Sequence, residues 1–323
     1  MRTAGAILLG LIVLATLAAP WLAPNPPNHR FAELLYAPPT GVHLGDGMGS
    51  PHVHPLRIVS RLERRFDEDR SAHVALRWFA DGVLVTADPD RGAPLLVLGA
   101  DAYGRDRFSR LLHGARATLS LGVLATLLAT AIGALVGGVA GSAGGRLDSV
   151  LSRLSEFVVV LPAIYVTLAL RAVMPLVLPA STTFMLLLAI FALLGWPMVA
   201  RGVRAIVASE REREYVLAAR AAGASPARLL TRHLLPAAAG YLSTQATLLL
   251  PAFILAESTM SYVGLGFSDA TPTWGTMLQE AANVAMLGDA PEALAPAAAI
   301  FMVVLGVNLL VQSTGRAPVQ LEP

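Results

Sequence analysis

A set of long apolar runs constrains the fold of this chain more than any other feature. Each run is close to the 20 or so mostly apolar residues that an α-helix needs to cross a bilayer. Only 14% of the 323 residues are charged, against about a quarter in soluble globular proteins. The sequence therefore predicts an all-α polytopic membrane protein with six transmembrane helices. The six runs are 4–23, 112–140, 154–178, 182–206, 237–263 and 294–313.

The first apolar run has two interpretations. It follows a single charge at Arg2, and the small residues Ala18 and Ala19 would suit the cleavage site of a signal peptide. However, the run is nearly of membrane length, and Pro20 would directly follow such a cleavage site. We therefore expect residues 1–23 to form an uncleaved transmembrane helix.

The Arg residues of the short loops predict the orientation, because short Arg-rich loops stay on the cytoplasmic side. All 24 basic residues are Arg. They are frequent in 144–153 and 201–232, and Arg316 follows the last run, whereas the loop over 264–293 carries acidic residues and no Arg. We expect a multi-pass membrane protein, surrounded by lipid, with both termini in the cytoplasm.

The polar segment 24–111 separates the first two runs, and it is long enough to be translocated despite its Arg residues. Within it, VALRWFADGVLVTAD places Asp81-Gly82 between two β-prone runs, which predicts a hairpin. We expect an extracytoplasmic insert with some β-structure. The chain has no Cys and thus no disulfide. We therefore expect contacts with the membrane part or with a partner to stabilise this insert.

The segment SEREREYVLAARAAGASPARLLTRHLLP (209–236) places many charges between two apolar runs. Its first half favours a helix, and Gly223 suits the left-handed position that ends one. Ser225 and Pro226 suit the N-cap and first turn of a second helix. The sequence predicts two short cytoplasmic helices joined rigidly to the next transmembrane helix. The alternative is an amphipathic loop lying on the membrane. The residues expected to form the apolar face of the second helix are Leu229, Leu230, His233 and Leu234.

This segment resembles the coupling loop of bacterial ABC importer permeases, which reads Glu-Ala-Ala, three residues, Gly, and Leu-Pro about a dozen residues later. Leu217 stands where that pattern has Glu, and His233 where it often has Ile. In that family the loop forms coupling helices that dock into a groove of the ATP-binding subunit. The resemblance implies a coupling loop over 207–236. The residues it assigns to coupling are Tyr215, Ala218, Ala219, Gly223, Ala224, Ser225, Pro226, Leu235 and Pro236.

Three further stretches resemble the dipeptide/oligopeptide/nickel subgroup of these permeases. They are LGADAYGRDRFSRLLHGARATLSLG (98–122), GGRLDSVLSR (144–153) and ILAESTMSYVGLGFSDATPTWGTML (254–278). The resemblance implies a type I ABC importer permease of the bacterial cytoplasmic (inner) membrane. Its core would extend over 112–316 and its cytoplasmic tail over 317–323. It implies four partners: a second homologous permease, two ATP-binding subunits and an extracytoplasmic solute-binding protein. The implied cargo is a di- or oligopeptide, with nickel or another small solute as the alternative.

The sequence also predicts what the chain does not do itself. It contains no G-x-x-x-x-G-K-[ST] phosphate loop, no H-E-x-x-H motif and no nucleophile elbow. We therefore expect a non-catalytic subunit without a cofactor, with ATP bound by its partners. A stand-alone secondary transporter or channel would need inverted repeats or broken spans with ion ligands, and a membrane enzyme would need ionisable pairs deep in the spans. The dispersed Arg residues predict no nucleic-acid binding.

Glu257 lies within a predicted span, followed by Ser258. An ionisable residue inside a membrane is costly and is a candidate functional residue. The resemblance places an acidic residue in the same ILAES setting, near the translocation path or an interhelical contact. Two interpretations remain open, namely a place on the translocation path and a structural hydrogen bond to a neighbouring helix.

Several other residues suggest local roles. Asp101, Arg105 and Asp106 predict an ion-pair network before the second span, with substrate contact as the alternative. Trp274 is typical of an aromatic anchor at the outer membrane interface. His52 and His54, with His43 nearby, are a weak signal for metal, and we assign no metal site. Small residues in the second span favour close helix packing within the chain, with a homodimer face as the alternative. These small residues are Gly133, Gly137, Gly138 and Gly141.

Overall fold

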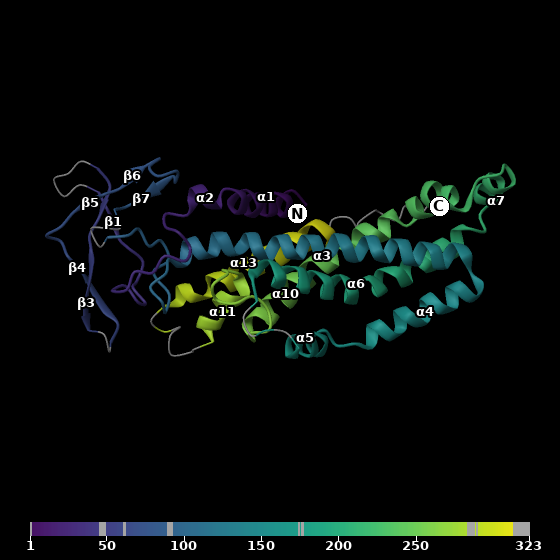
Figure 1. Ribbon diagram of the computed structural model, residues 1–323. Coiled ribbons are helices and arrows are strands. Elements are labelled where there is room, and N and C mark those ends of the chain that lie inside the picture. The colour runs from purple at the N-terminus through teal and green to yellow at the C-terminus, as the bar shows by residue number, and fades with distance from the viewer. Residues whose placement is uncertain are drawn as a thin grey trace. The chain divides into compact units, whose positions relative to one another are not determined.

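The computed structural model describes residues 2–44, 50–60, 63–88, 93–173, 175, 178–282, 288 and 290–312 (Figure 1). The predicted tail 317–323 and Arg316 lie outside the described residues. The chain divides into two compact units. One consists of 1–118 with 258–323, and the other of 119–257.

Helices form most of the described chain. The first unit contains α1 (Arg2–Leu17), α2 (Ala19–Leu22), α11 (Trp274–Ala281), the 3-10 helix η3 (Pro291–Leu294) and α13 (Ala295–Gln312). The second contains α4 (Gly145–Val160), α5 (Ala163–Ala172), α6 (Ala180–Glu210), α7 (Glu214–Ala221), α8 (Pro226–Leu229), the π-helix η2 (Leu230–Leu234) and α9 (Leu235–Ala237). Helices α3 (Arg107–Ala143) and α10 (Ala239–Tyr262) have residues in both units.

Among the described residues, four helices are long and apolar enough to cross a membrane. These are α3, α6, α10 and the helix over Pro291–Val311. The bent pair α4 and α5 would make a fifth candidate, and α1 is a shorter apolar helix of 16 residues. The structure therefore has the mostly helical character and four to five of the spans that the sequence predicts.

The region of the span expected over 154–178 is bent in the structure. The chain bends by 81° between α4 and the helical segment Ala163–Leu170. Leu161, between the two helices, has an extended backbone with ψ 113°. The ring of Pro162 explains this conformation, because it disfavours helical geometry in the residue before it. Pro162 also brings no N–H that would continue α4.

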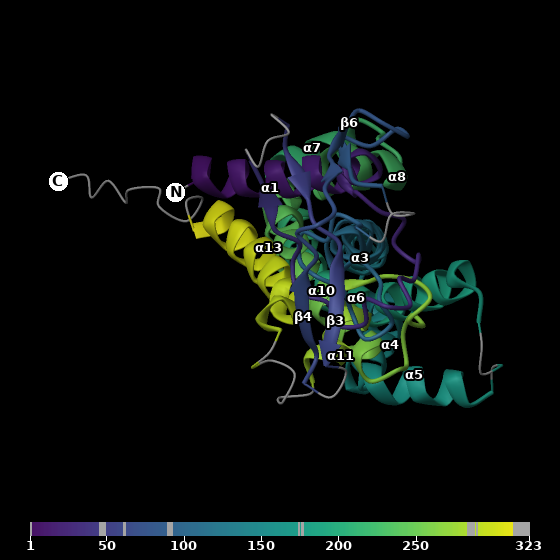
Figure 2. The same ribbon diagram turned by 90° about the vertical axis from the view of Figure 1, so that its left-hand side faces the viewer.

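Within the first unit, α1 packs along α13 (Figure 2). Two glycines make the close approach possible. A Cβ on Gly5 would lie 2.8 Å from the backbone oxygen of Gly306, and a Cβ on Gly306 would lie 2.8 Å from Cγ of Leu9. Because any larger side chain would push the helices apart, small residues set this contact between the first and last helices.

The polar segment 24–111 contains short antiparallel strands. One sheet has the order β1 (Val42–His43), β2 (His52–Val53), β5 (Val74–Ala75). A second pairs β3 (Leu56–Ser60) with β4 (Arg65–Glu68), which run side by side in Figure 2. Small apolar clusters underlie them, one of which is Val53, Val74, Ala87, Ala93 and Leu95. The predicted β-structure of this segment is therefore present.

The hairpin predicted from VALRWFADGVLVTAD is confirmed. It consists of β6 (Arg77–Trp78) and β7 (Val85–Thr86), paired antiparallel with Trp78 opposite Val85. Asp81 and Gly82 both have positive φ, 54° and 79°. Two successive left-handed residues are what a tight hairpin turn requires, and Asp-Gly supplies them at low cost.

Within the second unit, the small residues of α3 pack on α6, as the sequence favoured. A Cβ on Gly133 would lie 2.5 Å from Cβ of Val199, and one on Gly141 would lie 2.6 Å from the oxygen of Arg204. A Cβ on Gly137 would collide with the oxygen of Ala200. The glycine face of α3 is thus filled by a helix of the same chain.

Candidate functional site

The charged segment between α6 and α10 forms two short helices, as predicted, and residues 210–236 are here named the elbow. Helix α6 ends at Glu210, and α7 begins after a short turn. Gly223, with φ 85°, follows α7 in the left-handed conformation that ends many helices. Oγ of Ser225 accepts a hydrogen bond of 3.3 Å from the backbone N–H of Arg228, and Pro226 occupies the first turn of α8.

The elbow is packed onto α6 by one apolar cluster. Val216 of α7, Leu229 of α8 and Leu234 of η2 are buried. They share that cluster with Val203 and Val207 of α6. Because buried side chains from α7, α8 and η2 contact one surface, the elbow is held as a body on the end of α6.

A wide helical turn lies between α8 and α10. Residues Leu230–Leu234 form a π-helix, in which the N–H of Leu235 donates to the oxygen of Leu230. Pro236, which follows, has no N–H for the oxygen of Arg232, and its ring would crowd that oxygen in a regular α-helix. The widened turn relieves this conflict. The predicted apolar face is nevertheless present, because Leu229 and Leu234 are buried and Leu230 and His233 are half-buried.

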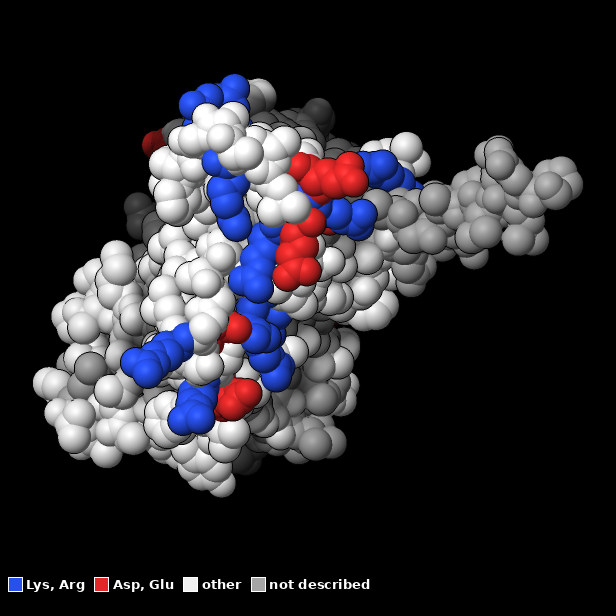
Figure 3. All heavy atoms as spheres, turned by 90° about the vertical axis from the view of Figure 1, so that its right-hand side faces the viewer, with Lys and Arg blue, Asp and Glu red and all other residues white. Residues whose placement is uncertain are grey.

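The outer surface of the elbow is exposed and carries neutral side chains together with charged ones, among them Glu212, Arg213 and Arg228. Tyr215 and Leu217 are each 47% exposed, and Ala218, Gly223, Ser225, Pro226 and Pro236 are also exposed. Ala219, Ala224 and Leu235 are half-buried against the apolar cluster. Arg and acidic side chains gather on the face where α7 lies (Figure 3).

The Tyr215 hydroxyl donates to Oε2 of Glu210 at 2.8 Å. This hydrogen bond to a carboxylate raises the pKa of the Tyr215 phenol, because it favours the neutral form, with a smaller effect from burial. The contact ties the first turn of α7 back to the end of α6.

Two Arg side chains tie the base of the elbow to neighbouring helices. Nη2 of Arg204, on α6, donates to Oδ2 of Asp148 at 2.7 Å in the first turn of α4. Nη1 of Arg211 donates to the backbone oxygen of Gly141 at 3.2 Å, near the end of α3. Between α3 and the elbow lies a groove of about 620 Å³. Its lining includes Val139, Ala143, Arg220, Pro226 and Leu230.

The two predicted residues of α10 are buried. The Glu257 side chain has no exposed surface, and Ser258 is 4% exposed. Oγ of Ser258 is buried and has no hydrogen-bond partner in the part of the chain that the structure describes. Neither side chain reaches an open surface of the chain in this conformation.

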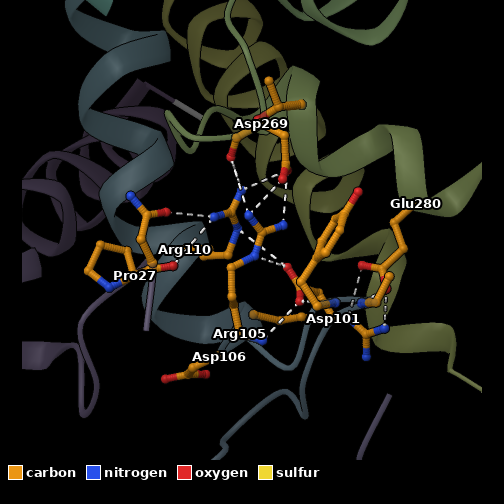
Figure 4. Close-up of polar contacts among 12 residues, drawn as sticks. Pro27, Asp101, Arg105, Asp106, Arg110, Asp269 and Glu280 are labelled. Atoms are coloured by element: carbon orange, nitrogen blue, oxygen red, sulfur yellow. Dashed lines mark hydrogen bonds and ion pairs between the residues drawn. The ribbon is translucent and has the colours of Figure 1, made fainter. Parts of the chain in front are cut away.

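A largely buried ionic cluster lies at the start of α3 in the first unit (Figure 4). Nε of Arg105 donates to Oδ2 of Asp101 at 2.7 Å, as the predicted local network requires. The same guanidinium also binds Asp269, with Nη1 2.7 Å from Oδ2. Nearby, Nη2 of Arg107 lies 2.8 Å from Oε1 of Glu280.

Asp106 is the exception in that prediction, because it makes no ion pair with an Arg among the described residues. Its Oδ1 accepts from the backbone N–H of Phe108 at 3.0 Å, so it caps α3. Its Oδ2 accepts from Asn25 at 3.0 Å and from Ser109. The residue therefore fixes the start of α3 through hydrogen bonds.

Sequence reasoning did not pair the remaining members of the cluster, Arg107, Arg110, Asp269 and Glu280. Their partners are 159 to 173 residues away along the chain. The sequence signal that could have paired them is opposite charge, because Arg107 and Arg110 precede an apolar run and the loop 264–293 is acidic. The cluster lines a cavity of about 300 Å³ together with Tyr36 and Tyr103.

The expectation for Trp274 is wrong. Its side chain is 2% exposed, so it is not an anchor at a membrane interface. Its Nε1 donates to the backbone oxygen of Leu111 at 3.2 Å, and its backbone N–H donates to Thr118 at 3.2 Å. The indole thus joins the start of α11 to α3, with its polar atom satisfied.

Residues 114–317 match the family of binding-protein-dependent transport system inner membrane components. The matched range contains the elbow and the helices on both sides of it. The chain belongs to this family. It is therefore a permease subunit of an ABC importer and a multi-pass inner-membrane protein, as the resemblance implied. Membership also implies an ATPase and a binding protein as partners.

Several curated permeases are similar to this one. The di/tripeptide permease DppC of Pseudomonas aeruginosa (strain UCBPP-PA14) is 30% identical over 306 residues, which cover 95% of this permease and 83% of that one. The dipeptide permease DppC of Bacillus subtilis (strain 168) is 37% identical, over 66% of this chain and 64% of that one. The oligopeptide permease OppC of the same strain is 34% identical, over 56% and 58%. A solved chain of the inward-facing MetNI methionine ABC transporter aligns with a TM-score of 0.49 and 18% identity, over 65% of this permease and 98% of that chain.

Proposed function

We propose that this permease imports di- or oligopeptides. The support is that the similar permeases from Pseudomonas aeruginosa and Bacillus subtilis are named for di/tripeptide, dipeptide and oligopeptide transport. The first of these similarities extends over 95% of the chain, including the segment before the family match. Nickel or another small solute is the alternative cargo, and a ligand measurement distinguishes them.

We propose a type I importer permease with six spans. The bent pair α4 and α5 is one of them, and α1 is the first. In this arrangement 1–23 crosses the membrane, 24–111 lies outside the cytoplasm, 112–316 forms the core, and 317–323 is a cytoplasmic tail. The support is the Arg distribution, because the elbow and the first half of α4 carry Arg while 264–282 carries none.

The elbow is the proposed contact with the ATP-binding subunits, and one observation carries this proposal. The elbow exposes a surface of small and neutral residues around Ala218 and Ser225, yet its inner side is packed onto α6 through Val216, Leu229 and Leu234. A flexible loop would deform when a partner moves against it and would leave the attached helices in place. A packed body transmits the push to the helix that carries it.

The mechanism follows from the connections of the elbow. Closure of two ATP-binding subunits would move the elbow as a body, and α6 and α10, which it joins, would move with it. The pore formed with a second homologous permease would then change from inward-open to outward-open and take cargo from the binding protein. Such switching requires two packed arrangements that differ by a few kcal/mol, which nucleotide binding can bias.

For Glu257 we favour the structural interpretation over a place on the translocation path. Its support is complete burial of the side chain within the chain, beside the buried Ser258. An ionisable group buried in a helix bundle is retained where it hydrogen-bonds to neighbouring groups.

The test is site-directed crosslinking of the assembled complex. Since the chain has no Cys, Ala219→Cys and Ser225→Cys each introduce the sole thiol. Both should crosslink to the ATP-binding subunit, whereas Arg70→Cys in the insert should crosslink only to the binding protein or to nothing. Absence of elbow crosslinks to the ATPase would overturn the coupling role. Mass spectrometry of the ligand carried by the co-purified binding protein decides between peptide and metal cargo.

A further inference from the structure

The sheet β1-β2-β5 gathers four of the seven histidines of the chain. His43 and His52 are opposite each other on β1 and β2. His54 follows β2, two residues after His52, and therefore lies on the same side of that strand. His73 directly precedes β5, the other neighbour of β2. Residues that are up to 30 positions apart in sequence thus meet because the sheet brings three strand ends together.

Three of these histidines have their ring nitrogens close to one another. Each of His52, His54 and His73 offers one nitrogen, and these atoms all lie within 4.8 Å of one another. Their ring centroids are 5.2, 5.1 and 4.8 Å apart. His52 and His54 are buried, with 0% and 2% of their surface exposed. Two buried imidazoles and one half-buried imidazole thus lie around one point.

Backbone contacts set the two buried rings in the tautomer that a metal ligand needs. Nδ1 of His54 lies 2.9 Å from the oxygen of Ala72, and Nδ1 of His52 lies 3.2 Å from the oxygen of Ser50. A carbonyl oxygen only accepts, so each Nδ1 carries the proton and each Nε2 has the lone pair. A hydrogen bond from the second ring nitrogen to a carbonyl oxygen is the usual way in which ligating histidines are oriented.

The third ring and its surroundings complete the set. Nδ1 of His73 is buried and has no hydrogen-bond partner among the residues that the structure describes. Beside the three rings, His43 lies with its ring centroid 4.7 Å from that of His54. Nε2 of His43 is 3.2 Å from Oε1 of Glu68, which places a carboxylate behind the cluster. The cluster therefore contains a buried polar nitrogen for which a bound cation would supply a partner.

From this geometry we propose that His52, His54 and His73 bind a divalent transition-metal ion of the zinc class. Three neutral imidazoles without any thiolate suit zinc, nickel or copper and do not suit calcium or magnesium, which prefer oxygen ligands. Zinc with three protein nitrogens leaves a fourth position for His43 or water. Zn–N bonds of about 2.1 Å set ligand nitrogens roughly 3.4 Å apart, so side-chain rotations that draw the nitrogens together would complete the site.

The bound ion would cross-link the sheet that holds its ligands. The strands β1, β2 and β5 are each two residues long, and the apolar cluster beneath them contains Val53, Val74, Ala87, Ala93 and Leu95. So small a core stabilises a fold weakly, and the chain has no Cys for a disulfide. A metal ion that joins β2 to the start of β5 would supply the missing cross-link.

The test uses the full-length permease purified without a polyhistidine tag and stripped with a chelator. ZnCl₂ is titrated, and bound metal is measured by mass spectrometry after gel filtration. CoCl₂ is the spectroscopic probe, because tetrahedral Co²⁺ absorbs strongly in the visible range. We expect one ion per chain, and a weakening of affinity by about tenfold or more in His54→Gln and in His73→Gln. His29→Gln, an exposed histidine outside the cluster, is the matched control and should bind as the parent does.

Limited proteolysis supplies a second readout that does not depend on transport. Zinc should slow cleavage within 24–111 in the parent and in His29→Gln, and it should have no effect in His54→Gln. If the cluster variants bind zinc as tightly as the parent, or if no saturable binding of zinc or cobalt occurs, the proposal is overturned. A variant that fails to fold is replaced by the second one, since His54 follows β2 and His73 precedes β5.

Discussion

Nη2 of Arg110 donates to both the backbone oxygen and Oδ1 of Asp269, at 3.0 and 3.2 Å, across 159 residues of sequence. The guanidinium of Arg105 binds the same carboxylate (Figure 4). Both Arg side chains are buried, so Asp269 neutralises two charges that have lost most of their water. The pairing fixes the start of α3 to the loop before α11.

Asp269→Ala should therefore destabilise the protein. Arg105 would keep Asp101 as its partner. Arg110 would keep its hydrogen bonds to Asn28 and to the backbone oxygen at position 269, but its remaining carboxylate partner would be Asp101 at 3.7 Å. We expect a loss of about 2–3 kcal/mol in the free energy of unfolding. The measurement is thermal unfolding in detergent, where the midpoint should fall by several degrees. Asp67→Ala, an exposed carboxylate in β4, is the control, and an equal effect of the two variants would contradict the prediction.

Gly223→Val should uncouple ATP hydrolysis from uptake. A Cβ at this position would meet no atom within 4 Å, so the substitution acts through φ 85° alone. A left-handed conformation costs an L-residue about 1–2 kcal/mol, enough to reshape the junction of α7 and α8. We expect the permease to reach the membrane, ATP hydrolysis to persist, and uptake in reconstituted vesicles to fall roughly fivefold or more.

Gly82→Val is the matched control for this prediction. Gly82 has φ 79° and equally open surroundings, but it lies in the hairpin of the insert. The Gly82→Val substitution therefore introduces the same kind of backbone strain at a site far from the elbow in sequence. Uptake by Gly223→Val at the level of Gly82→Val would argue against a coupling role for the elbow.

Gly137→Val should prevent α3 from packing on α6. The added side chain would collide with the backbone of Ala200, which cannot move aside as a side-chain end can. Overpacking of this kind costs about 1–3 kcal/mol or more, and the yield of folded protein from membranes should fall. Gly10→Val, on a helix where a Cβ meets nothing within 4 Å, should leave the yield unchanged. If both variants fold equally well, the close contact of α3 with α6 is wrong.

Single-thiol labelling should reveal opposite sides for the elbow and the insert. With no native Cys, Ser225→Cys and Arg70→Cys each report one exposed position. A membrane-impermeant maleimide applied to spheroplasts should label the second at once and the first only after permeabilisation. The reverse pattern would overturn the proposed orientation and, with it, contact between the elbow and an ATPase.

Glu257→Ala should lower assembly more than it lowers transport per assembled complex. The side chain is fully buried, and its loss leaves a cavity and removes a polar group from the interior. The amount of complex recovered from membranes and the uptake per complex separate the two effects. Glu63→Ala, an exposed carboxylate, is the control. Normal assembly with altered transport would favour a place on the translocation path.

The sequence was most informative where the structure depends on residues that are close together along the chain. Apolar runs of membrane length predicted α3, α6, α10 and the last helix, because burial in lipid requires a continuous apolar surface. Gly223, Ser225 and Pro226 predicted the end of one elbow helix and the start of the next, because capping acts within a few residues. Asp81 and Gly82 predicted a hairpin turn for the same reason.

Prediction from the sequence was weakest where a proline interrupts an apolar helical segment. The expected span over 154–178 ignored Pro162, at which the structure bends. The second elbow helix was expected to be regular, yet Pro236 is preceded by the π-helix Leu230–Leu234. In both places hydrophobicity favoured a continuous helix, whereas the missing N–H of proline decided the geometry.

The sequence by itself determined that this chain crosses a membrane, which family it resembles, and where a packed elbow of two helices interrupts the spans. Only the tertiary structure decided that Arg110 pairs with Asp269, that Trp274 is buried, and that His52, His54 and His73 meet. The physical reason is the range of the interactions. Periodicity and capping act within a few residues, whereas ion pairs and metal ligands depend on which distant segments the packed chain brings together.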